Sequence, residues 1–196
     1  AAGRTEAAEL LRQPDTLKEN THHCTRRDPP VVFLFGGQGA QYVNMGRGLY
    51  QAEPLFRAIV DQCCDLLRPH LDRDLKDVIF PADSDGDAAR ESLRNTIFTQ
   101  PAIFIIEYAL AAWWRSLGIE PSMMVGHSIG EFVAATIAGV FELPDVLRVV
   151  ASRGQLMQGL PPGAMLSVRA AAGEVKGLLS PSLQIAAINA PSLCVV

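Results

Sequence analysis

Gly126-His127-Ser128-Ile129-Gly130 is the stretch around which this sequence is organised. Residues 122–125 before it are short and mostly apolar, as in a buried strand, and residues 131–140 after it form a proline-free run of helix formers. A serine flanked by glycines at a sharp strand-to-helix turn is typical of a nucleophile elbow, which presents the hydroxyl at the carboxyl end of the strand. We therefore expect Ser128 to be a nucleophile.

The helix that follows the elbow would point its free N–H groups and positive dipole end at the reacting oxygen. The N–H of Ile129 lies where an oxyanion would form. The same pattern also fits a purely structural role, in which the Ser128 hydroxyl caps the helix. These two interpretations differ in whether the hydroxyl is free for chemistry.

Composition excludes several functional classes. The chain has 196 residues, 48% apolar and 19% charged, which is enough for one globular domain with a sizeable core. Its net charge of −4 provides no broad basic surface, so we expect no nucleic-acid partner. No apolar run reaches membrane-span length and the N-terminus lacks a signal-peptide core, so no membrane association is expected.

Metal and disulfide sites are not expected either. The cysteines are Cys24, Cys63, Cys64 and Cys194, none in a C-x-x-C spacing, which favours reduced thiols and a cytoplasmic protein. The run His22-His23-Cys24 has no further ligands at regular spacing. Residues 83–87 resemble a calcium loop, but its first and twelfth positions, which should be carboxylates, would be Pro81 and Ser92.

A second functional loop is predicted at Gly36-Gly37-Gln38-Gly39-Ala40-Gln41, directly after the apolar run 31–35. That run should be a parallel strand buried on both faces. A nucleotide-binding loop is disfavoured because Tyr42 stands where the third glycine is needed and no G-K-[ST] follows. The glycines favour close backbone approach to a neighbouring active site instead.

Helical patterns cover much of the remaining chain. The segment 99–116 is apolar nearly all round and should be a central buried helix, with Thr99 as its cap, Pro101 in its first turn and Gly118 at its end. Further helices are expected at 46–68 and from 143 to about 158, with at most a short helix at 6–12 and either a short helix or an irregular turn at 75–80.

Arg153 falls on the apolar face of the helix 143–158, with Val146, Val149, Val150 and Met157. An arginine on a buried face needs an anionic partner, because an unpaired buried charge is costly. The partner could be a substrate carboxylate. An internal ion pair, or a side chain that reaches the edge of the face, would be the structural alternatives.

The character of the chain changes after the hinge at 160–163. A strand at 164–168, a helix at 172–179 and strands at 183–188 and 192–196 give a β-α-β-β order, which indicates a small second subdomain. The sequence stops within the last strand, which is not how a finished domain ends.

Together these motifs resemble the acyltransferase domains of modular polyketide synthases, and are similar to malonyl-CoA:acyl carrier protein transacylases. The resemblance runs from about residue 30 to the end. It implies an α/β fold: an α/β-hydrolase-like parallel sheet core at 29–162, the start of a ferredoxin-like small subdomain at 163–196, and a ketosynthase-to-acyltransferase linker at 1–28. The stretches that carry it are 35–41, 99–102, 126–131, and Arg153 with 157–158 and 160–161.

The resemblance also implies roles for individual residues. Ser128 would carry the acyl group as an ester, and the backbone N–H groups of Gln38 and Ile129 would form the oxyanion hole. Arg153 would bind the free carboxylate of a malonyl-type chain, and Gln100 would line or brace the site. Ile129 after the serine resembles malonyl-selective relatives, whereas methylmalonyl-selective ones commonly place glutamine there.

The catalytic histidine is where this sequence departs from the family. The family's general base lies well downstream of the serine, whereas this sequence has only His22, His23, His70 and His127. The His127 side chain should diverge from its neighbour Ser128, so we expect it to contact substrate rather than act as the base. The chain is therefore expected to be an N-terminal part of a longer enzyme, inactive alone.

The activity implied is transfer of a malonyl-type extender unit from coenzyme A to an acyl carrier protein. No bound cofactor is expected, because the coenzyme A thioester is a substrate and phosphopantetheine arrives on the carrier protein. The partners would be that carrier protein, the ketosynthase and other modules of the same synthase. A serine hydrolase or esterase of the α/β-hydrolase type, and a non-catalytic remnant used as a docking segment, are the alternatives.

Overall fold

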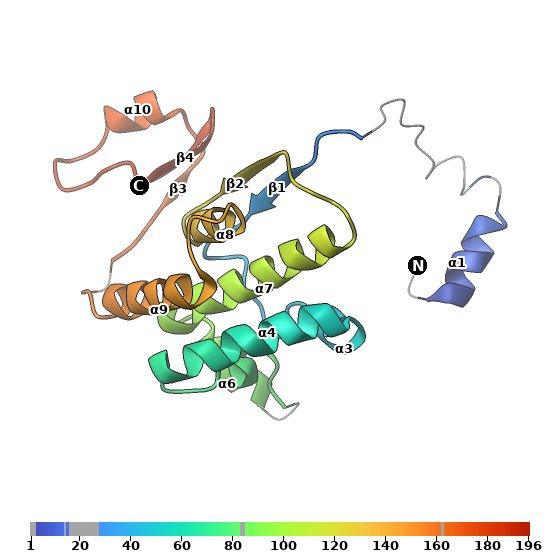
Figure 1. The fold of residues 1–196 in the computed structure, drawn as a ribbon. Coiled ribbons are helices and arrows are strands. Elements are labelled where there is room, and N and C mark those ends of the chain that lie inside the picture. Colours follow the sequence, from blue (N-terminus) through green and yellow to red (C-terminus); the bar gives the residue numbers. More distant parts are fainter. Residues whose placement is uncertain (1–2, 14, 16–27, 83–84, 162) are drawn as a thin grey trace.

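The computed structural model describes residues 3–13, 15, 28–82, 85–161 and 163–196 (Figure 1). The run His22-His23-Cys24 lies outside the described residues, as does most of the expected linker. Within that linker, the helix α1 (Arg4–Leu11) matches the expected helix and buries none of its residues.

A two-stranded parallel sheet and a layer of helices form the larger body (Figure 1). Strand β1 (Val32–Phe35) pairs with β2 (Met123–Gly126) in a register that sets Phe35 opposite Gly126. Both strands therefore end at the same edge, where the loop 36–41 and the elbow begin. The helices of this body are α3 (Arg47–Ala52), α4 (Pro54–Leu67), η1 (Arg68–His70), α5 (Leu75–Ile79), α6 (Gly86–Ser92), α7 (Thr96–Ser116), α8 (Ile129–Ile137) and α9 (Leu143–Gln158).

Helix α7 is the central, buried helix that its composition predicts. It packs against α4, α8 and α9, and most of its residues are buried. By length and composition α7 could cross a membrane, contrary to the expectation that no apolar run is long enough, but here it is the core helix of the body. Its start was predicted wrongly: α7 begins at Thr96, Pro101 lies inside it, and the Thr99 hydroxyl bonds to the carbonyls of Leu93 and Asn95.

Two further helix predictions need correction. The expected helix 46–68 is broken between α3 and α4, because Glu53 is extended and Pro54 starts a new helix. The helix α8 starts at Ile129 and is shorter than the 131–140 run. The helix α9, by contrast, runs from Leu143 to Gln158 as its pattern predicts.

The sheet is not buried on both faces, contrary to the expectation from its apolar strands. Successive side chains of a strand point to opposite faces, and only one face is covered here. Val32 and Leu34 of β1 and Met123 and Val125 of β2 are exposed, whereas Phe35 is buried. Among the described residues, no helix covers the face that carries those four side chains.

The C-terminal residues form a separate small sheet, drawn in orange and red in Figure 1. Strand β3 (Ser167–Val168) is followed by α10 (Ala172–Lys176), β4 (Ala187–Ala190) and β5 (Leu193–Val195). The β-α-β-β order is as predicted, although every element is shorter than its pattern. The strands are antiparallel in the order β3-β5-β4.

The described cysteines are free thiols. Cys63, Cys64 and Cys194 are all buried. Burial raises the pKa of the Cys63 and Cys64 thiols to about 12, which leaves them protonated and unreactive at neutral pH.

Close packing of α9 on α7 depends on Gly154. A Cβ at this position would lie 2.9 Å from the Thr96 carbonyl oxygen and 3.1 Å from the Ile97 Cα. Both neighbours are backbone atoms, so Gly154→Ala should force α9 outward and cost about 1–3 kcal/mol of stability. Urea-dependent pulse proteolysis of the intact protein would measure this loss.

Gly48→Ala is the matched control for this substitution. Gly48 is also helical, in α3, and a Cβ there would meet nothing within 4 Å. We expect it to be neutral or slightly stabilising, because alanine reduces the freedom of the unfolded chain. Equal stability of the two variants would mean that α9 does not need a glycine at its contact with α7.

Candidate active site

Ser128 sits on a strained turn between β2 and α8. Its backbone has φ 54° and ψ −111°, which an L-residue rarely adopts. The side chain makes no capping hydrogen bond to α8. The structural interpretation, in which the hydroxyl caps the helix, is therefore wrong, and the geometry is that of a nucleophile elbow.

The two glycines of the elbow are required by close contacts. A Cβ on Gly126 would lie 2.3 Å from the backbone nitrogen of Glu131. A Cβ on Gly130 would lie 2.6 Å from the carbonyl oxygens of Phe35 and Gly36. Gly126 thus allows the chain to turn back on itself, and Gly130 allows the first loop to approach the elbow.

The loop 36–41 lies against the elbow, as its glycines predict. The His127 N–H donates to the Phe35 carbonyl at 3.0 Å, which ties the end of β1 to the turn. A Cβ on Gly37 would lie 2.5 Å from the His127 Nδ1 atom, so the imidazole packs directly on this loop. The loop and the elbow therefore form one backbone surface beside Ser128.

Two backbone amides of this surface are free to bind an anionic oxygen. Ile129 is the first residue of α8, so its N–H has no acceptor one turn earlier in the helix. Gln38 lies outside any helix, and its N–H donates to none of the described residues. These are the two donors expected to form an oxyanion hole.

Arg153 of α9 reaches the Ser128 hydroxyl. Its Nη2 donates to the Ser128 Oγ at 3.2 Å, its Nη1 donates to the Gln100 Oε1, and its guanidinium lies over the Phe132 ring. None of the described carboxylates forms an ion pair with it. The internal ion pair considered from the sequence is therefore absent from the described part of the chain, and a half-buried cation stands beside the serine without an anion.

The face of α9 that carries Arg153 is less buried than its pattern predicts. Val146 and Val150 are buried, but Val149 and Met157 are exposed. Together with Arg153, these two line a hollow of about 580 Å³ on the outer side of α9. The guanidinium can therefore be reached from solvent.

A directed chain of hydrogen bonds links Arg153 to the loop. Since a guanidinium can only donate, Gln100 must accept through Oε1 and donate through Nε2. That Nε2 donates to the Thr96 Oγ1 at 2.7 Å, and the Thr96 hydroxyl donates to the Gln38 Oε1 at 3.2 Å. Gln100, which is fully buried, therefore connects Arg153 to Thr96.

Sequence reasoning missed Thr96 and Glu107, which both hold the loop. Thr96 lies four residues before Gln100, so the two share one face of α7, a spacing that could have indicated it. Glu107 accepts a hydrogen bond from the Gly36 N–H at 2.6 Å through its Oε1. Its signal was a lone carboxylate within the apolar helix 99–114.

No described imidazole contacts the Ser128 hydroxyl. His127 is exposed, and its side chain turns toward Gly37 rather than Ser128, as expected for neighbouring residues. His70 lies in η1, where its carbonyl accepts from the Gln155 side chain. Gln155 lies two residues after Arg153, on the other side of α9. Among the described residues, the Ser128 hydroxyl, two free amides and the Arg153 guanidinium therefore lie together, but no imidazole joins them.

The predictions about metal sites concern other parts of the chain. In the described ranges, no three His, Cys, Asp or Glu side chains gather closely enough to hold a metal ion. Of the acidic run, residues 83–84 lie outside the described part of the chain; Asp87 lies within α6 and pairs with Arg90 there.

Comparison with known proteins places these features in a family. The model of the acyl transferase domain matches residues 32–196. A phenolphthiocerol/phthiocerol polyketide synthase protein of Mycobacterium tuberculosis is 42% identical over 166 residues, which are 85% of this chain and 11% of that protein. The chain thus spans about a tenth of the length of this curated relative.

Solved structures agree with the sequence comparison. The acyl transferase domain of ZmaA matches with a TM-score of 0.86 and 36% identity, over 100% of this chain and 46% of that one. A malonyl CoA-acyl carrier protein transacylase from Clostridium perfringens matches with a TM-score of 0.73 and 26% identity, over 85% of this chain and 52% of that one. The chain therefore corresponds to about half of such a structure.

Proposed function

The chain belongs to the acyl transferase domain family, in the form found in polyketide synthases, and we propose that it moves a malonyl-type group from coenzyme A to an acyl carrier protein through an ester on Ser128. The observation that carries the proposal is the guanidinium of Arg153. It donates to the nucleophile hydroxyl and has no carboxylate partner among the described residues. A substrate with a free carboxylate near its thioester would supply the anion that Arg153 lacks, together with a carbonyl for the Ser128 hydroxyl to attack.

In the first half-reaction, the Ser128 Oγ attacks the thioester carbonyl and gives up its proton to a base. The carbonyl oxygen becomes an oxyanion, which accepts hydrogen bonds from the Gln38 and Ile129 amides. When the carbon–sulfur bond breaks, the coenzyme A sulfur takes the proton from the base, and coenzyme A leaves as a thiol. The acyl group remains as a seryl ester.

In the second half-reaction, the phosphopantetheine thiol of the carrier protein attacks that ester, and the same steps run in reverse. The thiol loses its proton, and the Ser128 oxygen regains one as it leaves. The described residues hold no base beside Ser128, so we propose that a histidine in the longer protein supplies it. This 196-residue stretch would then be inactive alone.

The finer features of the fold follow the same proposal. We infer that the parallel strands belong to an α/β-hydrolase-like core at 29–162, and that the β3-β5-β4 sheet is the first half of a ferredoxin-like subdomain beginning at 163. Residues 1–28 would link to a ketosynthase. Because the relatives are much longer, we propose that the partners are other modules of the same synthase. We also propose that this synthase is cytoplasmic.

The acyl unit is proposed to be malonyl rather than methylmalonyl. Ile129 follows the nucleophile and is buried, and it takes the place of the glutamine that is common in methylmalonyl-selective relatives. Gln100 and Arg153 then define one end of the acyl site and the two amides define the other, with Ser128 between them. His127 would contact substrate from the exposed side of the elbow.

Acyl competition in the intact synthase tests this function. The protein is mixed with equal malonyl-CoA and acetyl-CoA, and the peptide that contains Ser128 is weighed by mass spectrometry. We expect a malonyl adduct that disappears when carrier protein is added, with malonyl appearing on the carrier.

Three other results would contradict the proposal in different ways. Release of free malonate at the same rate with and without carrier protein would indicate a hydrolase. An acetyl adduct in excess of malonyl would remove the carboxylate role. A protein that forms no adduct at all would be a non-catalytic remnant.

A further inference from the structure

Glu107 is a half-buried acid in an apolar helix. It lies on α7, where residues 101–106 before it are all buried. Its Oε2 is the one buried side-chain oxygen or nitrogen without a hydrogen-bond partner in the described chain. Burial raises the pKa of the Glu107 carboxyl to about 7, although the hydrogen bond from Gly36 acts in the opposite direction. Such a group is costly to bury, and a hydrophobic residue would suit the helix better.

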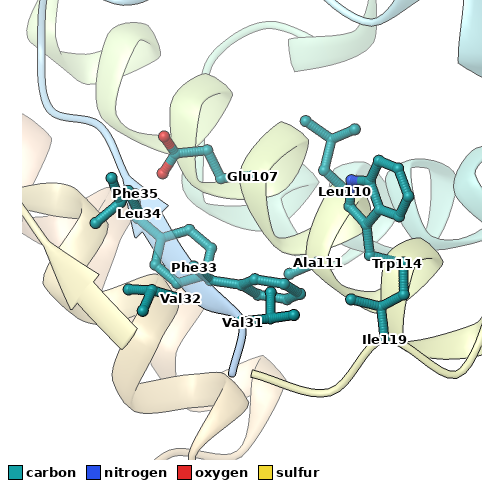
Figure 2. A pocket seen from close by; sticks show the side chains of 10 residues that line it. All are labelled: Val31, Val32, Phe33, Leu34, Phe35, Glu107, Leu110, Ala111, Trp114 and Ile119. Carbon is teal, nitrogen blue, oxygen red and sulfur yellow. The ribbon is translucent and has the colours of Figure 1, made fainter. Parts of the chain in front are cut away.

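The position of the Glu107 carboxyl indicates a role that offsets the cost of burying it. A hollow of about 530 Å³ lies between β1 and α7. Figure 2 shows Glu107 at one end of it, with its carboxyl directed toward Phe35. The far end of the hollow is apolar and includes Leu110 and Trp114. The acid is therefore placed where β1 ends and the loop begins.

The contact itself is short and specific. The Glu107 Oε1 accepts from the Gly36 N–H at 2.6 Å, which is short even for a hydrogen bond with an ionised partner. A Cβ on Gly36 would lie 3.2 Å from the same oxygen, so a larger residue would crowd the contact. Gly36 is the first residue after β1, two residues before Gln38.

Helix α7 thus holds the loop at two points. Glu107 binds the backbone at Gly36, and Thr96, three turns earlier, binds the side chain of Gln38. In addition, the His127 N–H donates to the Phe35 carbonyl. The peptide group that carries the Gln38 N–H lies between these anchors, so its direction depends on all of them.

We propose that Glu107 is a positioning residue, which holds the Gly36 amide so that the Gln38 N–H points at the oxyanion formed on the Ser128 substrate. The inference rests on the proposed acyl transfer. It adds a residue that touches neither substrate nor nucleophile. A misplaced Gln38 amide would stabilise the transition state less. The ground-state complex, in which Arg153 holds the acyl carboxylate, would change little.

Kinetics of Ser128 acylation in the intact synthase test the proposal. Glu107→Ala should lower kcat for malonyl-CoA by about 10–100-fold, because a small misplacement of a catalytic group is costly. The KM should stay within about twofold, since binding is left intact. Glu107→Gln should retain kcat within about threefold, because its amide oxygen can still accept from Gly36.

Leu110→Ala is the matched control. Leu110 lies on the same helix and lines the same hollow, but it makes no hydrogen bond to the loop. Its substitution should lower the stability of the protein, without the selective loss of kcat at nearly unchanged KM that is expected for Glu107→Ala. If Leu110→Ala and Glu107→Ala lost the same kcat, or if Glu107→Ala kept the wild-type kcat, Glu107 would be only a packing residue and the proposal would be wrong.

Hydrogen exchange provides a readout that does not need activity. The Gly36 amide should exchange at least about tenfold faster in Glu107→Ala than in wild type or Glu107→Gln, because it loses its acceptor. The Gly39 amide, which donates to the Gln41 side chain at 2.7 Å, should not change. Unchanged exchange at Gly36 would overturn the anchor, and so would a Glu107→Gln variant as slow in kcat as Glu107→Ala.

The two sets of measurements separate this inference from the function on which it rests. A wild-type synthase that forms no Ser128 adduct contradicts the proposed acyl transfer, whatever the exchange at Gly36. An adduct formed equally fast in wild type and Glu107→Ala leaves acyl transfer in place and removes only the role of Glu107.

Discussion

Ser128→Ala is expected to abolish acylation of the intact synthase by malonyl-CoA. The hydroxyl oxygen is the atom that would form the ester, and alanine has none. Removal of the nucleophilic serine from a serine enzyme costs about 10⁶-fold in kcat. The expected result is the loss of the malonyl adduct from the peptide that contains Ser128, measured by mass spectrometry after brief incubation.

The substitution should leave the fold intact. Serine and alanine both carry a Cβ, so the strain at φ 54° is the same in both. The hydroxyl makes no capping bond that alanine would lose, and its hydrogen bond from Arg153 is a single contact of 3.2 Å. Unchanged urea-dependent proteolysis would establish that the variant is folded.

Ser152→Ala is the control for this experiment. Ser152 precedes Arg153 on α9, is exposed, and should retain the full adduct and rate. An adduct of equal mass and rate in Ser128→Ala would place the acyl group on another residue. The strained turn would then need an explanation other than nucleophilic catalysis.

Local sequence patterns predicted the elements that carry chemistry better than those that only support them. The elbow was predicted because its turn needs glycine at both Gly126 and Gly130, a requirement written in adjacent residues. The helix α9 was predicted with its correct start and approximate end, because its start and its apolar period are both local. Such features depend on near neighbours along the chain.

The errors arose where distant contacts decide the outcome. The start of α7 was misplaced because Pro101 suggested a first turn, yet the bonds of Thr99 to Leu93 and Asn95 belong to a helix that begins earlier. The burial of β1 was overestimated because an apolar strand does not reveal which of its faces is covered. Neither the start of α7 nor the covered face of β1 follows from the spacing of hydrophobic residues alone.

The candidate site shows the same division. Its chemical groups and Gln100 could be named from motifs, but the two residues of α7 that hold the loop, Thr96 and Glu107, could not. Thr96 and Glu107 act across 58 and 71 residues of sequence, on Gln38 and Gly36 respectively. Only the packing of α7 beneath the loop brings them there, so single-sequence reasoning has no signal for their partners.

Arg153→Ala in the intact synthase is expected to lower kcat/KM for malonyl-CoA by about 10²–10³-fold, at about 1.4 kcal/mol per tenfold. A planar guanidinium can hold a carboxylate with two parallel charge-assisted hydrogen bonds. Removal of one partner from a desolvated pair of this kind costs roughly 3–5 kcal/mol. Acetyl-CoA has no carboxylate, so its kcat/KM should change little or rise.

The structure sharpens this expectation, because it fixes the guanidinium before substrate arrives. One nitrogen is held by Gln100, whose amide is oriented in turn by Thr96, and the other faces Ser128. The cation is therefore already directed at the acyl site, and little side-chain entropy is lost on binding. Arg153→Lys should restore only part of the activity, because an ammonium can keep the charge but not the fork.

Arg148→Ala is the matched control on the same helix. Arg148 is exposed and pairs with Asp145 at 3.0 Å, so its loss should affect neither substrate by more than about twofold. The decisive quantity is the ratio of kcat/KM for malonyl-CoA to that for acetyl-CoA, compared between wild type and Arg153→Ala. A fall in this ratio of about 10²-fold or more would establish carboxylate recognition. Equal losses for the two substrates would make Arg153 a structural brace of Ser128 and Gln100, and the acyl unit would have to be recognised elsewhere.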